Sequence, residues 1–306
     1  MQTRTFPEVR RQQITSVADP SYEQKRGVFI EWFRVGLIKV LGLLPRKLAQ
    51  TVFLAFSGKN GDCVTVFKNV TTWRALETMY TYEQRREEGK TTFNSRLWEG
   101  FLDNARSIRN RLVLVREELN LAIQKTAVGK ETIHILSIGS GSARSVLETI
   151  ALYNGGSLRI NALLIDMDQT AIEFSKELAH KLGINGCATR LTGNFFRLER
   201  DAAEFKPEIV ELVGLLDYLT NKQVVVLLGK VCRILQPGGY IVTGNITPNP
   251  ERPFVTKGIN WPMTYRRPEE LKKLLVEAGF PTETIRIRQE PLGIHTIAIA
   301  QKLPSP

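Results

Sequence analysis

"HILSIGSGSA", residues 134–143, decides how the chain is built. The apolar run from His134 to Ile138 has the length and composition of a buried strand, and the glycines and serines after it indicate a tight turn. The residues that follow, 142–153, predict a helix. A strand that ends on a turn with almost no side chains lets a ligand approach the backbone closely. We therefore expect a ligand to lie against Gly139, Ser140 and Gly141.

From about residue 131 to the end, β-rich apolar runs alternate with helical patterns. The predicted strands cover 133–138, 160–165, 187–192, 208–214, 239–245, 283–289 and 294–300. The predicted helices cover 142–153, 168–182, 221–235 and 268–279. This order predicts an α/β fold with a doubly wound, mostly parallel seven-stranded sheet. Only "QEPLG" separates the last two strands, so these are expected to form a C-terminal antiparallel hairpin.

The chain before residue 131 lacks this alternation and is predicted to be mainly helical. "GVFIEWFRVGLIKVLGLL" at 27–44 predicts an apolar helix that ends before Pro45, and residues 97–124 predict one long amphipathic helix. We expect two parts. Residues 1–130 would form a helical cap that covers the cofactor edge of the sheet and selects the substrate, and residues 131–306 would form the cofactor-binding domain.

Composition is that of a globular protein, with 42% apolar and 24% charged residues. The three cysteines, Cys63, Cys187 and Cys232, are odd in number and far apart, which argues against a disulfide framework and against a metal site. The first residues lack the apolar core of a signal peptide, and no run reaches the ~18 apolar residues of a membrane span. These features predict a cytoplasmic protein without a metal ion.

The positive charge is concentrated before the predicted sheet. Net charge is +11, and residues 1–130 carry 22 Lys and Arg against 13 Asp and Glu, whereas residues 131–306 carry 20 against 18. A basic region can face nucleic acid, a membrane surface or an acidic small molecule, but most often it is a solvated helical surface. Nucleic acid is therefore an unlikely partner by this criterion, and the sequence indicates no oligomeric state.

The glycine turn is informative about the cofactor. A dinucleotide-binding turn would need a third glycine where this chain has Arg144, and no Gly-Lys-Ser/Thr follows to bind phosphates. Asp166 ends the second predicted strand, 27 residues after Gly139. A carboxylate at that position can accept hydrogen bonds from both hydroxyls of a ribose.

Four segments in register resemble the motifs of class I S-adenosylmethionine-dependent methyltransferases: "ILSIGSGSA", "LLIDMDQTAIEFSKELA", "TRLTGNFF" and "LQPGGYIVTGN". The resemblance covers about residues 131–302. It implies S-adenosyl-L-methionine as the cofactor, with its amino acid portion against the glycine turn and its ribose on Asp166. It also implies that Met167 and Phe195 contact the adenine, although both could equally be core side chains. Asn194 stands where the family often has an acid, and its side-chain oxygen could accept from the adenine amino group.

Methyl transfer needs a base only when the nucleophile carries a proton. The base candidates near the expected site are Asp217, Tyr218, Tyr265 and His295; the last is more often a packed strand residue in a segment such as "GIHTIAIA". The candidates for binding the substrate are Tyr80, Arg109, Asn245 and Trp261. Because Arg109 and Arg111 are two residues apart on one helix, at most one of them is expected to point into the site.

Two absences narrow the substrate. The chain has no Asn-Pro-Pro-Tyr after the fourth strand and no Pro-Cys, the segments used in methylation of nucleic acid bases. The region "GLLDYLTNKQVVVLLGKVCRILQPGGYIVTGNITPNP" is also similar to a bacterial branch associated with methyl esters of hydroxy fatty acids. We therefore expect O-methylation of a carboxylate or hydroxyl on a small molecule, with peripheral contact to a membrane or a lipid substrate. The alternative is an RNA-binding or partner-binding methyltransferase-like protein without catalysis.

Overall fold

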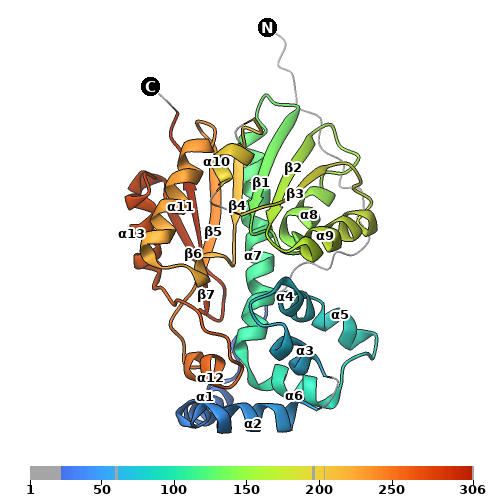
Figure 1. Ribbon diagram of the computed structural model, residues 1–306, viewed down its shortest axis with the longest axis vertical. Coiled ribbons are helices and arrows are strands. Elements are labelled where there is room, and N and C mark those ends of the chain that lie inside the picture. The colour runs from blue at the N-terminus through green and yellow to red at the C-terminus, as the bar shows by residue number, and fades with distance from the viewer. Residues whose placement is uncertain (1–21, 59–60, 195–196, 203, 305–306) are drawn as a thin grey trace.

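The computed structural model describes residues 22–58, 61–194, 197–202 and 204–304. A seven-stranded sheet forms one part of the molecule, and a group of short helices forms the other (Figure 1). The strands lie in the order β3-β2-β1-β4-β5-β7-β6. Their bounds are β1 Thr132–Ile138, β2 Arg159–Asp166, β3 Ala188–Thr192, β4 Ile209–Leu212, β5 Tyr240–Ile246, β6 Arg286–Gln289 and β7 His295–Gln301.

This sheet confirms the predicted fold class. β1 to β5 pair in parallel, whereas β7 is antiparallel to both β5 and β6. The chain moves outward from β1 in both directions, so the strand order reverses between β1 and β4. In an open parallel sheet the crevice outside the strand ends at such a reversal is where ligands bind.

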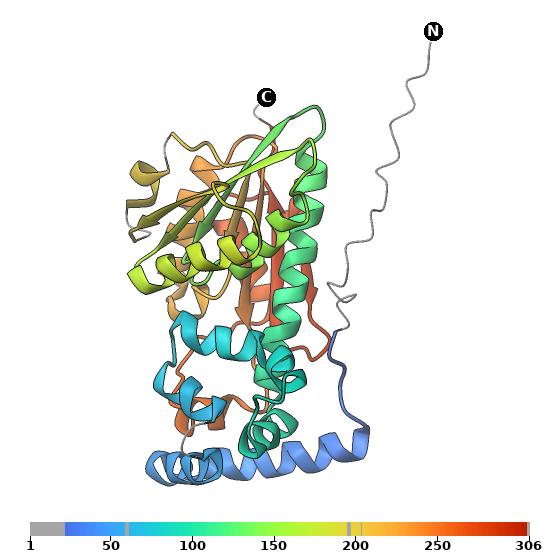
Figure 2. The same cartoon turned by 90° about the vertical axis from the view of Figure 1, so that its right-hand side faces the viewer.

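Helices cover both faces of the sheet (Figures 1 and 2). On one face, α8 Arg144–Ala151, α9 Gln169–Lys181 and the second half of α7 Asp103–Thr126 enclose one apolar cluster. On the other, α10 Leu198–Asp201, α11 Asn221–Ile234 and α13 Pro268–Glu277 enclose a second cluster. Both faces of β1 are therefore buried, which explains why this strand is almost wholly apolar.

The helical part has a core of its own. Its helices are α1 Val28–Leu43, α2 Arg46–Ser57, α3 Asp62–Lys68, α4 Trp73–Tyr80, α5 Tyr82–Glu87 and α6 Phe93–Phe101. A segment far along the chain, α12 Arg252–Lys257, packs among them after β5. The core is aromatic: the ring of Trp98 lies 4.9 Å from that of Phe53 and is stacked on Phe254 at 5.8 Å.

The single long helix expected over 97–124 is wrong, because the chain is extended at Leu102 and divides it into α6 and α7. At this break stands the buried carboxylate of Glu251, which comes from the turn before α12. It accepts from the backbone N–H of Asp103 at 2.7 Å and from that of Asn104 at 3.0 Å. A tertiary contact thus satisfies the first amides of α7, a role that a local side chain usually has.

α7 connects the two parts. Its second half contributes Leu119 and Ile123 to the cluster under the sheet, and its first half contributes Ile108 to the helical core. α4 is also fastened to the sheet part, since Arg144 donates to Glu77 at 2.7 Å and Trp73 Nε1 donates to Thr170 Oγ1 at 3.1 Å. The predicted division at residue 130 stays a prediction, because α7 packs in both parts. Among the described helices none is long and apolar enough to cross a membrane.

Candidate active site

The turn after β1 has the backbone that glycine favours. Gly139 has φ +63° and Gly141 has φ +53°, both in the left-handed region. The backbone N–H groups of Gly139 and Ser140 donate to the carbonyl of Ile165 at the end of β2, at 2.9 and 3.1 Å. A Cβ at Gly139 would stand 3.4 Å from the side chain of Leu215. Because Gly139 and Gly141 carry no side chain, a ligand can approach the backbone of the turn closely.

Asp166 lies at the end of β2, beside this turn. Its Oδ2 accepts from the N–H of Gly141 at 2.7 Å, and its Oδ1 accepts from the N–H of Asp168 at 2.8 Å. These bonds fix the carboxylate, and each oxygen keeps a second lone pair for a ligand. Asp168 caps α9 by accepting from the N–H of Thr170 at 2.8 Å.

A pocket opens at this edge of the sheet, and we call it the cofactor pocket. It is lined by Thr71, Thr72, Trp73, Leu76, Ile138, Gly139, Gly141, Ile165, Asp166, Met167, Asp168, Gly193, Asn194, Val213, Gly214, Leu215 and Tyr218. These features suit S-adenosylmethionine. The backbone of the glycine turn can contact its amino acid portion, the Asp166 carboxylate can bind its ribose, and the exposed Met167 side chain offers apolar surface for its adenine. Phe195, expected beside the adenine, lies outside the described residues. Ser140 faces an adjoining pocket with Tyr80, and its hydroxyl is without a partner among the described residues.

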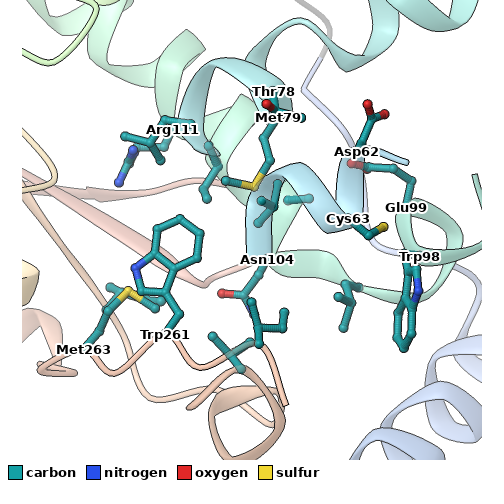
Figure 3. A pocket seen from close by; sticks show the side chains of 18 of the residues that line it. Asp62, Cys63, Thr78, Met79, Trp98, Glu99, Asn104, Arg111, Trp261 and Met263 are labelled. Atoms are coloured by element: carbon teal, nitrogen blue, oxygen red, sulfur yellow. The ribbon is translucent and has the colours of Figure 1, made fainter. Parts of the chain in front are cut away.

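A second, mainly apolar cavity lies between the sheet edge and the helical part (Figure 3). Its apolar lining comes from α2, α3, α4, α6, α7 and the segment around α12: Phe53, Cys63, Val66, Leu76, Met79, Trp98, Leu102, Ala105, Ile108, Val255, Ile259, Trp261 and Met263. We call it the apolar cavity. It shares Leu76, Gly214 and Tyr218 with the cofactor pocket, so the two meet at these residues. On the side away from this junction, Glu99 pairs with Arg109 and Asn104 donates to Glu251.

Arg111 lies at the junction and is buried. Its Nη2 donates to the hydroxyl of Tyr80 at 3.1 Å, but its Nε is without a partner and it forms no ion pair within the described part of the chain. Gly214, with φ +89°, lies beside the guanidinium, since a Cβ built there would be in van der Waals contact with Nη1 at 3.8 Å. A buried cation with a free donor is a site for an anionic group.

His295, at the start of β7, lines the same end of the apolar cavity. It is 2% exposed, and both ring nitrogens are without a hydrogen-bond partner among the residues described. Burial, and then the charge of Arg111, hold its pKa well below the ordinary 6.5. The imidazole is therefore neutral near pH 7 and can accept a proton or a hydrogen bond.

Tyr218 and Trp261 form a hydrogen-bonded pair at the junction. Trp261 Nε1 donates to the Tyr218 hydroxyl at 2.8 Å, which leaves the hydroxyl hydrogen free to point elsewhere. Burial and the nearby carboxylate of Asp217 raise the pKa of Tyr218, so this side chain is a hydrogen-bond donor rather than a base. Asp217 lines the apolar cavity and accepts from the N–H of Ile246 at 2.8 Å, and burial raises its pKa.

Three of the expected site residues lie away from this junction. Arg109 pairs with Glu99 and Glu23, so Arg111 is the arginine that lines the apolar cavity. Asn245 is buried in the wall behind it, where its amide donates to the carbonyl of Thr264 and accepts from Arg266. The ring of Tyr265 packs under the guanidinium of Arg252 and is not part of the cavity lining. In each case a neighbour distant in sequence binds the side chain.

Glu211 is a further buried group near the site, and it was not among the residues predicted from the sequence. It lies in β4, accepts from the Ser137 hydroxyl at 2.6 Å and lines the pocket that contains Ser140 and Arg111. Burial raises its pKa to about 7. The available signal was an acid inside the apolar strand "IVEL", where a charge needs a partner.

Comparison with known proteins agrees with this geometry. The model of one protein family, described as "Putative methyltransferase", matches residues 50–302. No curated protein matches the sequence significantly. Among solved structures, a Bordetella parapertussis protein described as a "possible exported protein" is similar with a TM-score of 0.63 and 17% identity, over 90% of this chain and 97% of its own. The S-adenosylmethionine-dependent methyltransferase SibL has a TM-score of 0.53 and 16% identity, over 90% of this chain and 71% of its own.

Proposed function

The chain belongs to the methyltransferase family that it matches and is an S-adenosylmethionine-dependent enzyme of the class I fold, and from this premise we propose that it methylates an oxygen atom of a small, mainly apolar molecule. One observation carries the proposal. The apolar cavity meets the cofactor pocket at Gly214 and Tyr218, and at that end stand Arg111 and His295, two buried polar side chains that form no ion pair with any described residue.

S-adenosylmethionine supplies an activated methyl group, and its transfer is an in-line displacement. The protein must then align the acceptor atom and exclude water. The helical part suits the second task, because Trp73 and Leu76 of α4 cover the cofactor pocket while α2, α3 and α6 close the apolar cavity. The Tyr218 hydroxyl, held by Trp261, stands where the two spaces meet and can donate to the acceptor group.

Arg111 favours the hypothesis that the methyl acceptor is a carboxylate. The guanidinium has a free Nε–H and no ion pair among the described residues, so a substrate carboxylate would satisfy it. A carboxylate is already a nucleophile and needs no base. Arg111 would then hold one oxygen while the other faces the methyl group.

His295 favours the alternative hypothesis that the methyl acceptor is a hydroxyl. A hydroxyl must lose its proton as the methyl group arrives, and the unprotonated ring nitrogen of the neutral His295, which has no hydrogen-bond partner among the described residues, can take it. The two readings differ in pH dependence. Ester formation would stay constant down to the pKa of the substrate acid, whereas ether formation would fall once His295 is protonated, well below pH 6.5.

We place the reaction in the cytoplasm, a proposal supported by the three cysteines, all of which are unpaired thiols. RNA binding through the basic helical part remains the competing hypothesis. It predicts RNA affinity that falls steeply with salt and no methyl transfer to small molecules.

The test is methyl transfer from tritiated S-adenosylmethionine to paired acceptors, alkanoic acids and the alcohols of the same chain length. We expect label in the apolar extract with the acids, and its release by mild alkali would identify a methyl ester. Alkali-stable label from the alcohols would select the hydroxyl reading. If the protein binds the cofactor but labels neither series, nor any other apolar oxygen acid or alcohol, the proposed acceptor class is wrong.

A further inference from the structure

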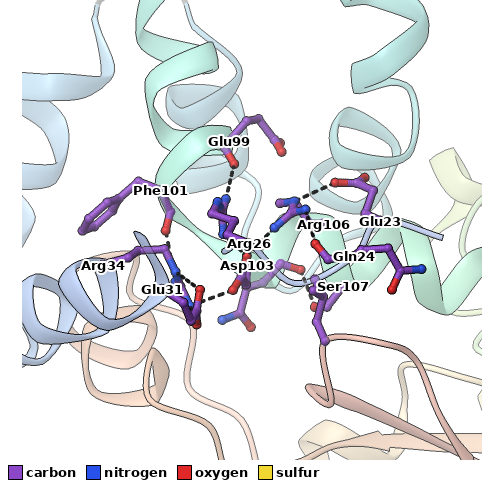
Figure 4. Close-up of polar contacts among 12 residues, drawn as sticks. Glu23, Gln24, Arg26, Glu31, Arg34, Glu99, Phe101, Asp103, Arg106 and Ser107 are labelled. Carbon is purple, nitrogen blue, oxygen red and sulfur yellow. Dashed lines mark hydrogen bonds and ion pairs between the residues drawn. The ribbon is translucent and has the colours of Figure 1, made fainter. Parts of the chain in front are cut away.

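α1 turns Arg34 and Glu31 toward the protein, whereas most of its large apolar residues face solvent. Arg34 is buried and pairs with Asp103 at 2.6 Å, with Glu31 at 2.5 Å and with Glu251. It also donates to the carbonyl of Phe101 at 3.1 Å (Figure 4). The ionic side of the helix is thus fixed against the start of α7. Among its large apolar side chains only Ile38 is fully buried, whereas an ordinary surface helix turns a whole apolar stripe to the core.

The outer side of α1 is a continuous display of large apolar side chains. Val28 is 88% exposed, Phe29 81% and Trp32 76%. The others that solvent reaches are Ile30, Phe33, Leu37, Val40 and Leu43. Apolar surface of this extent on one helix marks an interaction site.

The neighbouring helices also expose large apolar side chains. α2 exposes Leu48, Leu54 and Phe56, and α6 exposes Phe93 and Leu97. α1 and α2 lie at the end of the molecule farthest from the sheet, and both run along that end rather than pointing away from it (Figures 1 and 2). We call the exposed side chains of α1 and α2 the outer face.

The charges of the outer face have one sign. Its exposed charged residues are Lys39, Arg46 and Lys47, and the one acid of the two helices, Glu31, is bound to Arg34. Apolar side chains among basic ones are the composition of a helix that lies in the headgroup region of an anionic bilayer.

We propose that the outer face docks the protein onto an anionic membrane surface, with α1 lying in the plane of the interface. A helix of 16 residues is about 24 Å long, shorter than the ~30 Å hydrocarbon core, and the buried ion pairs of Arg34 hold it against the protein body. α1 therefore lies on a bilayer without spanning it. Its apolar side chains enter the interface while Lys39, Arg46 and Lys47 contact anionic headgroups.

The charge of the outer face favours an anionic membrane over a second copy of the chain as its partner. A symmetric dimer brings the same patch of both copies together, so the basic residues of two outer faces would meet with no exposed acid on α1 or α2 to offset them. An anionic bilayer offers both apolar depth and the opposite charge. The proposal does not depend on the proposed reaction, although docking there would bring the protein close to apolar acceptors.

The test is co-sedimentation of the full chain with vesicles of phosphatidylcholine alone or with 30 mol% phosphatidylglycerol, at low salt and at 0.5 M NaCl. We expect binding to the anionic vesicles. Phe29→Ser/Trp32→Ser/Phe33→Ser should weaken it at least tenfold, whereas Val128→Ser/Val226→Ser, which changes exposed apolar residues elsewhere, should not. Lys39→Glu/Lys47→Glu should weaken it about fivefold at low salt only, with Lys222→Glu/Lys273→Glu as the control.

Circular dichroism and cofactor affinity of each variant verify that the fold is intact. Absence of binding by the unaltered chain to anionic vesicles overturns the proposal, as does equal binding by the triple variant. A mass of two chains in solution that the triple variant reduces to one, without vesicle binding, would assign the outer face to a second copy instead. None of these outcomes affects the methyl-transfer proposal, because the measurement uses no substrate.

Discussion

The cofactor pocket and the apolar cavity are adjacent but are made of different parts of the molecule. The cofactor pocket is formed largely by backbone and strand ends: the turn at Gly139–Gly141 and the end of β2 at Asp166. The apolar cavity is formed by side chains from α2, α3, α4, α6, α7 and the segment around α12, together with residues that follow β4, end β5 and begin β7, some more than 200 residues apart. The first site depends mainly on local conformation, with α4 as its cover, and the second depends on how distant segments pack. A variant that affects one site and spares the other tests this separation.

The largest effect on turnover is expected for Arg111→Met. Loss of the charged hydrogen-bond donor costs about 1.5–3 kcal/mol, and misplacement of the acceptor adds to it, so turnover should fall about 100-fold or more. Arg111→Lys keeps the charge and should recover part of the loss. Steady-state kinetics measures the fall in turnover, and calorimetry measures the affinity for S-adenosylmethionine. If Arg111→Met weakens cofactor binding as much as turnover, the two sites are not separate in function.

Asp166→Ala should act on the other site. We expect cofactor affinity to fall by about 1–3 kcal/mol, or roughly 5- to 150-fold, because a fixed carboxylate acceptor is lost. At saturating cofactor the acceptor KM should change little. Isothermal titration of the folded variant measures the first quantity, and unchanged affinity would remove Asp166 from the cofactor site. NAD should not compete.

Trp261→Phe should have a smaller effect. The aromatic wall of the apolar cavity remains, but the Tyr218 hydroxyl loses the donor that orients it, a neutral hydrogen bond worth about 0.5–1.5 kcal/mol. We expect turnover to fall about 3- to 10-fold with cofactor affinity intact. Tyr218→Phe is the matched partner: if the bond acts through Tyr218, the double variant should lose little beyond the single one.

Glu211→Gln should change the pH dependence of stability more than the activity. The pKa of Glu211 is about 7 in the folded protein and near 4.5 when unfolded, so between these values the folded state binds more protons. Its contribution to stability is full below about pH 4.5 and is lost as pH rises to 7, with a slope of at most ~1.4 kcal/mol per pH unit. Urea unfolding of both proteins at pH 5 and 7.5 should show a smaller decline for the variant, and equal declines would contradict the assignment.

The features that the sequence predicted are those that depend on neighbouring residues, and the features that it did not predict depend on contacts between distant segments. The strands and the glycine turn were predictable because each depends on residues within a few positions: the apolar run 134–138 forms β1, and Gly139 and Gly141 adopt the positive φ of the turn. Which arginine lines the apolar cavity was not, because Arg109 and Arg111 are equivalent in local pattern. Glu99 and Glu23 bind the first and leave the second at the junction.

The helical part shows the limit most clearly. The sequence by itself determined that 27–44 forms a helix, because its apolar and helix-forming residues predict a helix without knowledge of what packs against them. The tertiary structure alone decided that Glu31 and Arg34 face inward, that Leu102 interrupts the predicted long helix, and that α12 joins the helical core. The buried carboxylate of Glu251 takes part in the first two, because it binds Arg34 and the first amides of α7. Phe254 and Val255 bring α12 into the helical core. Local patterns do not encode such contacts, because a buried charge takes its partners wherever the packed chain brings them.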